Sequence, residues 1–346
     1  FGVQYGPSEP LYHVTNHAAA TTTIELGEVK RLATSSPRTG AASTPATDPW
    51  SFYATMTATS PATAFPLDRA ADGSAVMWLE APHQSVVVLD RPMITRLDAT
   101  FDLLESDPPS MLIVRSRDER VWVAGADLKE ISQLDNNELD AYLAEGQRVF
   151  GRLAAMPFPV VAAVCGATLG GGLELAMHCH GIVASRMSHR GKPYPIGLPE
   201  ASLGLCPGWG GTQLLPARVA PDTSVQAIAS GTPFLSEAMP EGLCDVLVST
   251  ADELEAACRT LAPALHPANL PRTIACCDEE MLLAEVDHIR HATESDQAAG
   301  VVAHCIATGV KDGLAAGLDM EREGLCSLRN TEHTTNLLRA FLAKKA

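Results

Sequence analysis

Long apolar runs and positive charge are both scarce in this sequence. No apolar run approaches the roughly 18 to 20 residues that a transmembrane helix requires, so no membrane span is predicted. Lys and Arg number 25 against 41 Asp and Glu, which gives a formal net charge of −16 at pH 7. So acidic a chain disfavours nucleic acid as a partner, because phosphates bind to basic surfaces. An anionic small molecule can still bind through a few local Lys and Arg residues.

The nine cysteines do not resemble a disulfide framework. Their number is odd and they are scattered between Cys165 and Cys326, which is typical of reduced thiols in a cytosolic protein. Because 46% of the residues are hydrophobic, the chain can bury a substantial core. These features predict a soluble, acidic, cytoplasmic protein.

Three catalytic signatures are also missing. The sequence has no GxSxG motif, which argues against a serine hydrolase. Gly208 and Gly210 lack the third glycine of a dinucleotide fingerprint because position 213 is Gln213, so NAD chemistry is not indicated. The His and Cys residues at 178–180 and 276–291 lack the spacing of a zinc ribbon or an HExxH helix. They are interpreted as core or surface residues, and no metal is predicted.

Composition divides the chain into three parts. Residues 1–65 are rich in Ser, Thr, Ala and Pro, with no sustained period of 2 or 3.6, and are predicted to be a disordered or non-native extension. Translation is expected to start at Met56, and the acidic residues before it fit a transit peptide poorly. Residues 66–250 are expected to form an α/β core, and residues 251–346 a helical region that packs on the core or makes oligomer contacts.

Within the core, strand and helix patterns alternate from about residue 72. Strands are expected at 74–82, 110–116, 121–125, 160–164 and 181–185, and helices at 92–106, 136–156 and 172–179, the second with an Asn as its cap. This alternation predicts a mostly parallel sheet covered by helices. Further helices are expected at 251–264, 278–292, 297–309, 313–328 and 332–344.

The stretch CGATLGGGLELAMHCH (165–180) places three glycines directly before a helix. The first N–H groups of a helix have no intrahelical acceptor and lie at the positive end of its dipole, so they can hold a developing oxyanion. Glu174 follows in the first turn, beside this anion site, which suits proton chemistry. In the competing interpretation the glycines only allow tight strand–helix packing, and Glu174 complements the dipole.

Two other segments have a similar arrangement. VWVAGADLKEI (121–131) places another exposed amide, that of Ala126, before a helix that opens at Asp127. IGLPEASLGLCPGWGGTQLLPARV (196–219) is a glycine-rich loop that contains Glu200 and a second glycine turn at 208–211.

With SGTPFLSEAMPEGLCDVLV (230–248), these segments resemble the enoyl-CoA hydratase/isomerase (crotonase) superfamily, and within it most the hydratase module of multifunctional fatty-acid oxidation proteins. The resemblance covers about residues 72–250 in the correct order, and more loosely the helical C-terminal region. It implies an α/β fold, a crotonase-like spiral of ββα units, with an acyl-CoA site. No metal or bound redox cofactor is implied, because CoA arrives as part of the substrate.

By motif position, the resemblance also implies roles for single residues. The backbone N–H groups of Ala126 and Gly171 would hold the thioester oxygen, Glu200 would protonate Cα of a 2-enoyl-CoA, and Glu174 would orient or deprotonate the water that attacks Cβ. The implied activity is hydration in fatty-acid β-oxidation or related acyl-CoA metabolism. The residues expected to bind acyl-CoA are Ala124, Asp127, Leu128, Lys129, Gly170, Trp209, Phe341 and Lys344.

Several alternatives stay open. The same two glutamates suit a Δ3,Δ2-enoyl-CoA isomerase or a bifunctional enzyme. A third alternative is a catalytically weak scaffold with a displaced Glu200, because SRMSHRGKPYPIG (185–197) carries several extra residues. Val87, His180 and Leu214 replace residues usual in the family and are interpreted as structural. The resemblance further implies a homotrimer or a dimer of trimers, and a 3-hydroxyacyl-CoA dehydrogenase is a candidate partner.

Overall fold

A six-stranded sheet forms the base of the molecule. The computed structural model describes residues 64–81, 86–267, 274, 278–292 and 296–343, and the backbone of residues 11–16 and 20–25. In the order β12-β9-β7-β5-β4-β3, neighbouring strands run parallel except β3 and β4, which confirms the predicted mostly parallel sheet. The strands are β3 Leu67–Arg69, β4 Ala75–Leu79, β5 Leu112–Ser116, β7 Val160–Val164, β9 Gly181–Ser185 and β12 Val246–Val248.

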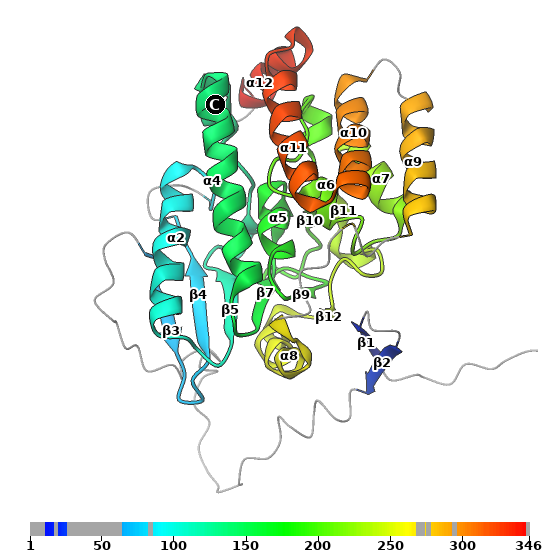
Figure 1. Ribbon diagram of the computed structural model, residues 1–346. Helices are drawn as coiled ribbons and strands as arrows, with labels where there is room; N and C mark the ends of the chain where they lie inside the picture. Colours follow the sequence, from blue (N-terminus) through cyan, green and yellow to red (C-terminus); the bar gives the residue numbers. More distant parts are fainter. Residues whose placement is uncertain are drawn as a thin grey trace, which may run out of the picture.

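Helices surround this sheet and form the C-terminal region (Figure 1). They are α2 Arg91–Ser106, α3 Leu128–Gln133, α4 Asn136–Ala155, α5 Gly171–Met177, α6 Gly211–Leu214, α7 Pro221–Ser230, α8 Leu254–Leu261, α9 Glu279–Ala292, α10 Gln297–Asp312, α11 Leu314–Arg329 and α12 Glu332–Ala343. In Figure 1, α9, α10 and α11 stand side by side, and these helices pack on α4, α6 and α7. The helical region therefore packs on the core, one of its two predicted roles.

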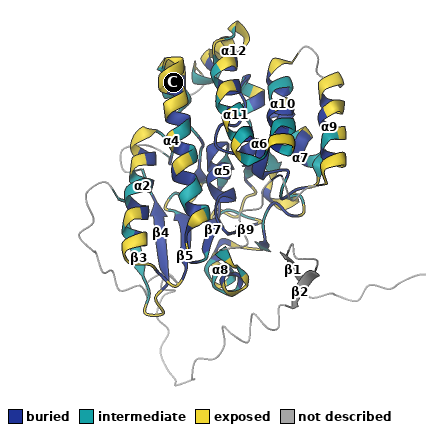
Figure 2. Ribbon diagram, viewed as in Figure 1, coloured by how far each residue is buried: buried dark blue, intermediate teal, exposed yellow. Residues whose placement is uncertain are grey.

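The two faces of the large sheet enter separate hydrophobic clusters because side chains alternate along a strand. Val76, Ile113 and Val161 pack on the face that α8 covers, together with Leu254 of that helix. Met77 points to the opposite face and belongs to the larger cluster, to which α2 and α4 contribute. Figure 2 shows the strands as the most buried part of the molecule, with the outer faces of α2, α4 and α9 exposed.

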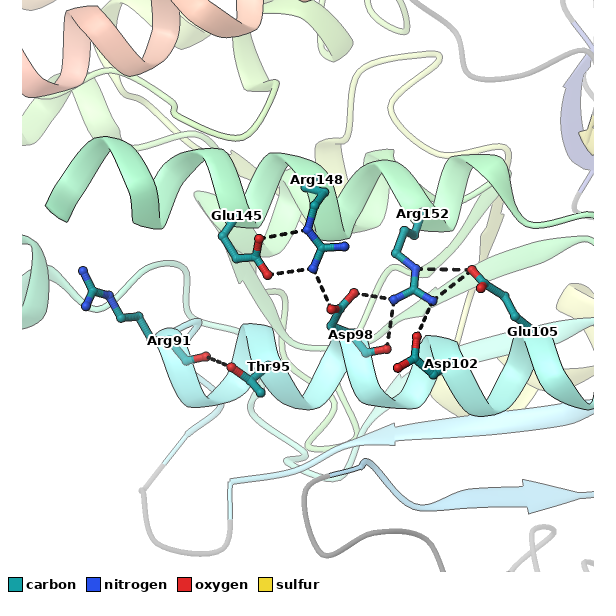
Figure 3. Close-up of polar contacts among 8 residues, drawn as sticks. All are labelled: Arg91, Thr95, Asp98, Asp102, Glu105, Glu145, Arg148 and Arg152. Carbon is teal, nitrogen blue, oxygen red and sulfur yellow. Dashed lines mark hydrogen bonds and ion pairs between the residues drawn. The ribbon is translucent and has the colours of Figure 1, made fainter. Parts of the chain in front are cut away.

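Ion pairs join the exposed faces of α2 and α4 (Figure 3). Arg148 pairs with Asp98 at 2.6 Å and with Glu145 at 2.7 Å. Arg152 pairs with Asp98 as well, and with Asp102 at 2.8 Å. Exposed pairs contribute little individually, about 0–1 kcal/mol each, so the buried contacts between these helices carry most of the stability.

Some helix boundaries differ from those predicted. The cap of α4 is Asp135, not an Asn: its side chain accepts from the N–H of Glu138, whose own side chain completes a capping box. The single helix expected at 251–264 is shorter, with α8 flanked by 3-10 turns at Ala251–Glu253 and Ala262–Ala264, because Pro263 lacks an N–H donor. Helix α7 was not predicted from the sequence.

A second sheet has four short strands in the order β11-β10-β8-β6. They are β6 Val121–Val123, β8 Ala167–Leu169, β10 Pro195–Gly197 and β11 Phe234–Leu235. The chain crosses from β7 of the large sheet to β8 at Gly166, whose φ of 104° and close approach to the Arg120 carbonyl suit glycine alone. Of these four strands, only β6 was predicted.

The N-terminal part contains one departure from expectation. Strands β1 Leu11–Asn16 and β2 Ala20–Glu25 pair antiparallel in a segment for which no regular structure was predicted. Three consecutive threonines at 21–23 favour a strand because their branched Cβ suits extended backbone. The rest of residues 1–63, with Met56, lies outside the described residues. Among the described residues, no helix is both long and apolar enough to cross a membrane.

Candidate active site

Three neighbouring strands of the smaller sheet bring the predicted site residues together. β6, β8 and β10 run parallel, so their carboxyl ends lie at one edge of the sheet. Ala126 follows β6, Gly170 follows β8, and Glu200 follows β10 at the start of a 3-10 turn, Glu200–Leu203. The N–H of Gly170 donates to the carbonyl of Gly197 at 2.9 Å, which ties the second loop to the third.

Each glycine of the run 170–172 has its own steric reason. Gly170 has a φ of 54°, and a Cβ there would collide with the carboxyl of Glu200. A Cβ on Gly171 would collide with the indole of Trp209, and a Cβ on Gly172 would come within 2.5 Å of the Val123 carbonyl in β6. Gly172 therefore serves strand–helix packing, whereas Gly170 and Gly171 keep the backbone open toward Glu200 and Trp209.

Two backbone segments that offer N–H groups lie against each other here. Gly171 is the first residue of α5, so its N–H has no intrahelical acceptor. A Cβ built on Gly125 would lie 3.7 Å from the nitrogen of Gly171, so the turn before Ala126 touches the start of α5. The N–H of Leu89 donates to the Gly125 carbonyl at 2.8 Å and fixes this turn. The backbone just before Ala126 and the start of α5 therefore lie in contact.

Glu174 is buried in the first turn of α5, with 1% of its surface exposed. Its Oε1 accepts hydrogen bonds from the backbone N–H groups of Trp209 and Gly211, each at 2.8 Å. Burial raises the pKa of Glu174 to about 7, against the effect of these hydrogen bonds. A carboxyl with a pKa near neutrality can accept and release a proton at physiological pH.

The carboxyl of Glu200 is enclosed even though the residue as a whole is only partly buried. Its Oε2 is buried and has no hydrogen-bond partner among the described residues. Burial, and then the negative charges of Glu174 and Glu321, raise the pKa of Glu200 well above its usual range. Glu200 therefore holds its proton more tightly than an ordinary glutamate, and its Oε2 is free to contact a substrate or water.

The extra residues before Glu200 form an exposed turn, in which the N–H of Ser188 donates to the Lys192 carbonyl at 2.8 Å. The chain then enters β10, which pairs with β8 before Glu200 is reached.

Trp209 fills the space between α4 and Gly171 and is only 2% exposed. Its ring centroid lies 5.3 Å from those of both Tyr142 and Phe150, and a Cβ on Gly146 would collide with the indole. This packing is compatible with the contact to acyl-CoA that the sequence predicts for Trp209. One edge of the indole packs on α4 and the other covers Gly171.

The remaining predicted binding residues lie around this centre. Asp127 caps α3 by accepting from the N–H of Lys129 at 2.8 Å, and the Lys129 side chain is exposed. Ala124 and Leu128 are partly buried in the same loop and helix. Helix α12, which carries the partly buried Phe341, packs against α3. Lys344 lies outside the described residues.

The histidines first considered as metal ligands have structural surroundings. His180 is buried, accepts from the N–H of Val160 through Nδ1 at 2.9 Å, and lies with Nε2 3.2 Å from the Ala154 carbonyl. These contacts confirm the structural interpretation of this position. His178 is also buried, whereas His288 and His291 are exposed.

One residue of the site was missed. Glu321 of α11 is fully buried, and it binds the same loop as Glu174. A sequence signal existed: helical spacing places Glu321 on one face with Gly317, Gly324 and Leu328, all apolar positions. A carboxylate on the apolar face of a helix is unusual, because burying it costs free energy.

Comparison with known proteins agrees with this architecture. The family model described as enoyl-CoA hydratase/isomerase matches residues 70–323. A probable enoyl-CoA hydratase of Bacillus subtilis (strain 168) is 38% identical over 183 residues, which are 52% of this chain and 67% of that protein.

Two solved structures are similar at lower identity. A carnitinyl-CoA dehydratase from Mycobacterium thermoresistibile has a TM-score of 0.60 and 19% identity, covering 80% of this chain and 88% of its own. The human mitochondrial delta3-delta2-enoyl-CoA isomerase has a TM-score of 0.58 and 22% identity, covering 80% and 96%. At these identities the likeness shows the fold, and the fold class expected from the sequence is confirmed.

Proposed function

Since the chain belongs to the enoyl-CoA hydratase/isomerase family, we propose that it is an enoyl-CoA hydratase, which adds water reversibly across the 2,3 double bond of a 2-enoyl-CoA. The observation that carries the proposal is the contrast between two neighbouring buried carboxyls. Glu174 is held by two backbone N–H groups, whereas Glu200, whose pKa is raised well above its usual range, leaves one oxygen unpartnered.

The proposed reaction uses these groups in order. The thioester oxygen accepts hydrogen bonds from the N–H groups of Ala126 and Gly171, which stabilise the enolate that forms as water attacks Cβ. A donor of this kind typically contributes about 3–4 kcal/mol to the transition state. Glu174 takes a proton from the attacking water, and Glu200 gives its proton to Cα. The net change is addition of one OH and one H, and the reverse reaction uses the same groups.

The acyl-CoA itself is expected to lie across this edge of the smaller sheet. Lys129, exposed after the Ala126 turn, is a candidate contact for CoA phosphates, and Phe341 with Lys344 for the adenine end. Gly170 leaves the space in which Glu200 meets the substrate. We further propose that CoA serves only as part of the substrate and that no metal takes part.

The test follows the loss of conjugated enoyl-thioester absorbance with crotonyl-CoA. Wild type is expected to be active, and Glu174→Gln and Glu200→Gln to lose about 100- to 10,000-fold in kcat. The matched control is Glu119→Gln, at an exposed glutamate, which is expected to retain full activity. Hydratase activity that survives either active-site change would contradict the two-glutamate mechanism.

A Δ3,Δ2-enoyl-CoA isomerase is the second candidate, favoured by the unpartnered Oε2 of Glu200. One carboxyl alone can move a proton between Cα and Cγ, so the isomerase reaction does not require proton transfer by Glu174. A 3-enoyl-CoA substrate separates the two: the isomerase reaction creates conjugated absorbance. An enzyme that converts 3-enoyl-CoA and leaves crotonyl-CoA unchanged would replace the hydratase proposal by the isomerase one.

A further inference from the structure

Four consecutive backbone N–H groups, at residues 209–212, alternate between two buried carboxyls. The N–H groups of Trp209 and Gly211 donate to Oε1 of Glu174. The N–H of Gly210 donates to Oε2 of Glu321 at 2.7 Å, and that of Thr212 to Oε1 of Glu321 at 2.8 Å. The loop is thus held from two sides, by α5 and by α11.

All of the hydrogen bonds described for the Glu321 carboxyl come from this loop. Its carboxyl is fully buried, and a third donor, the hydroxyl of Thr212, lies 2.6 Å from Oε1. No Lys, Arg or His pairs with Glu321 among the described ion pairs. A buried carboxyl without a cation is costly, and an apolar side chain would fill the same helix face at less expense. The contacts that Glu321 makes therefore indicate a role beyond packing.

The loop transmits the position of Glu321 to the reacting groups. The amides alternate along the loop. When Glu321 fixes the N–H groups of Gly210 and Thr212, it also fixes the direction of the adjacent N–H groups that hold Glu174. The same loop carries the indole of Trp209, which lies against Gly171.

We infer that Glu321 is a positioning residue for the proposed hydration: it holds the 209–212 loop so that Glu174 is oriented, and when ionised it adds a negative charge near Glu200. The inference rests on the proposed function, since it assigns a part in that reaction to a residue that touches no substrate. The titratable groups that face Glu321 are Glu174 of α5, Glu200, Cys206 and Cys305 of α10. None of them carries a positive charge.

The pH dependence follows from this set of groups. Burial and the charge of Glu174 raise the pKa of Glu321 to about 8, so Glu321 is ionised on the alkaline side of the activity profile. There its charge helps to raise the pKa of Glu200. Removing that charge lowers the pKa of Glu200, so the acid loses its proton at lower pH.

The experiment compares Glu321→Gln with Glu323→Gln, a control at an exposed position of the same helix. We expect Glu321→Gln to lower kcat by about 10- to 100-fold with KM for crotonyl-CoA changed less than about twofold, since misplacement of a catalytic group costs turnover. The alkaline limb of the kcat/KM profile is expected to move to lower pH, while the control follows wild type.

Two results would overturn the inference while leaving the hydratase proposal intact. One is a Glu321→Gln enzyme with the kinetics of the control. The other is a lower kcat with an unmoved alkaline limb, which indicates only a reduced folded fraction. A wild type inert on crotonyl-CoA overturns both proposals.

If Glu321→Gln does not fold, Thr212→Val carries the test, because it removes the hydroxyl that donates to Glu321 and accepts from the Gln213 amide, and leaves the Glu321 carboxyl in place. A kcat lowered by about 3- to 10-fold, at unchanged melting temperature, supports the inference, in line with the loss of one hydrogen bond to a charged group. An unchanged kcat overturns it.

Discussion

At the scale of single residues, environment separates side chains of the same type. Glu174, Glu200 and Glu321 carry the same carboxyl group, yet the first receives two backbone N–H groups, the second leaves an oxygen unpartnered, and the third receives three donors. Glu323, two residues from Glu321, is exposed on the same helix. Burial and neighbouring charge, not residue type, decide which glutamate can exchange a proton near neutral pH.

Trp209 carries the prediction that belongs to this scale. Trp209→Ala is expected to lower the free energy of unfolding by about 3–5 kcal/mol, because it leaves a cavity between α4 and Gly171. It should also raise the ratio of kcat/KM for a longer 2-enoyl-CoA over crotonyl-CoA, since the indole borders the expected acyl position. Denaturant unfolding measures the first effect, and assays with both substrates measure the second. Trp209→Phe is a more conservative variant for which both effects are expected to be smaller. A ratio that stays constant in both variants would leave Trp209 with a packing role alone.

At the scale of elements, the length of a strand or helix determined whether it could be predicted from the sequence. Strands 160–164 and 181–185 and helix α4 follow from their own residues, because continuous apolar runs and a 3.6-residue period are local signals. β8, β10 and β11 have two or three residues each, too few for any period, and their pairing joins distant segments. The site motifs were therefore recognisable from the sequence, but the sheet that brings Ala126, Gly170 and Glu200 together was not.

The packing of α10 on α11 provides a prediction with a built-in control. The Gln213 side chain enters between these helices, donates to the Cys305 carbonyl at 2.9 Å, and lies where a Cβ on Gly309 or Gly317 would stand. Gly309→Ala improves helix propensity by about 1 kcal/mol, but the collision with Gln213 costs about 1–3 kcal/mol and should prevail. Gly300→Ala, in the same helix with no neighbour near its Cβ, is expected to stabilise.

Urea unfolding of the two variants measures whether each substitution raises or lowers the free energy of unfolding. The expected result is a lower midpoint for Gly309→Ala and a higher one for Gly300→Ala, at similar slopes. Stabilisation by both substitutions would mean that Gln213 leaves its place at little cost.

At the scale of the whole molecule, the buried carboxyls make stability depend on pH. The pKa of Glu321 is about 8 in the folded protein against 4.5 as its ordinary value. The folded state therefore keeps a proton that the unfolded chain releases, and stability falls as pH rises from about 4.5 to about 8. His178, with its pKa lowered to about 4 by burial, acts in the opposite direction between about pH 4 and 6.5.

Comparison of wild type with Glu321→Gln isolates the contribution of Glu321 to the pH dependence of stability. Relative to Glu321→Gln, wild type is expected to lose free energy of unfolding as pH rises from about 4.5 to about 8, with a constant difference above that range. Denaturant unfolding at several pH values measures this difference, and Glu323→Gln provides the baseline. A difference that stays constant from about pH 4.5 to about 8 would show that Glu321 is ionised in the folded protein throughout this range.

The hydrogen bonds between Glu321 of α11 and the 209–212 loop also have a consequence for the order in which the site forms during synthesis. A ribosome releases Glu174 and Glu200 well before it releases Glu321, because α11 follows them in the chain. Until α11 docks, two of the four loop amides lack their acceptor, and the nascent chain contains both glutamates without the arrangement proposed for turnover. On the proposed function, chains that end before α11 are therefore expected to be inactive toward acyl-CoA.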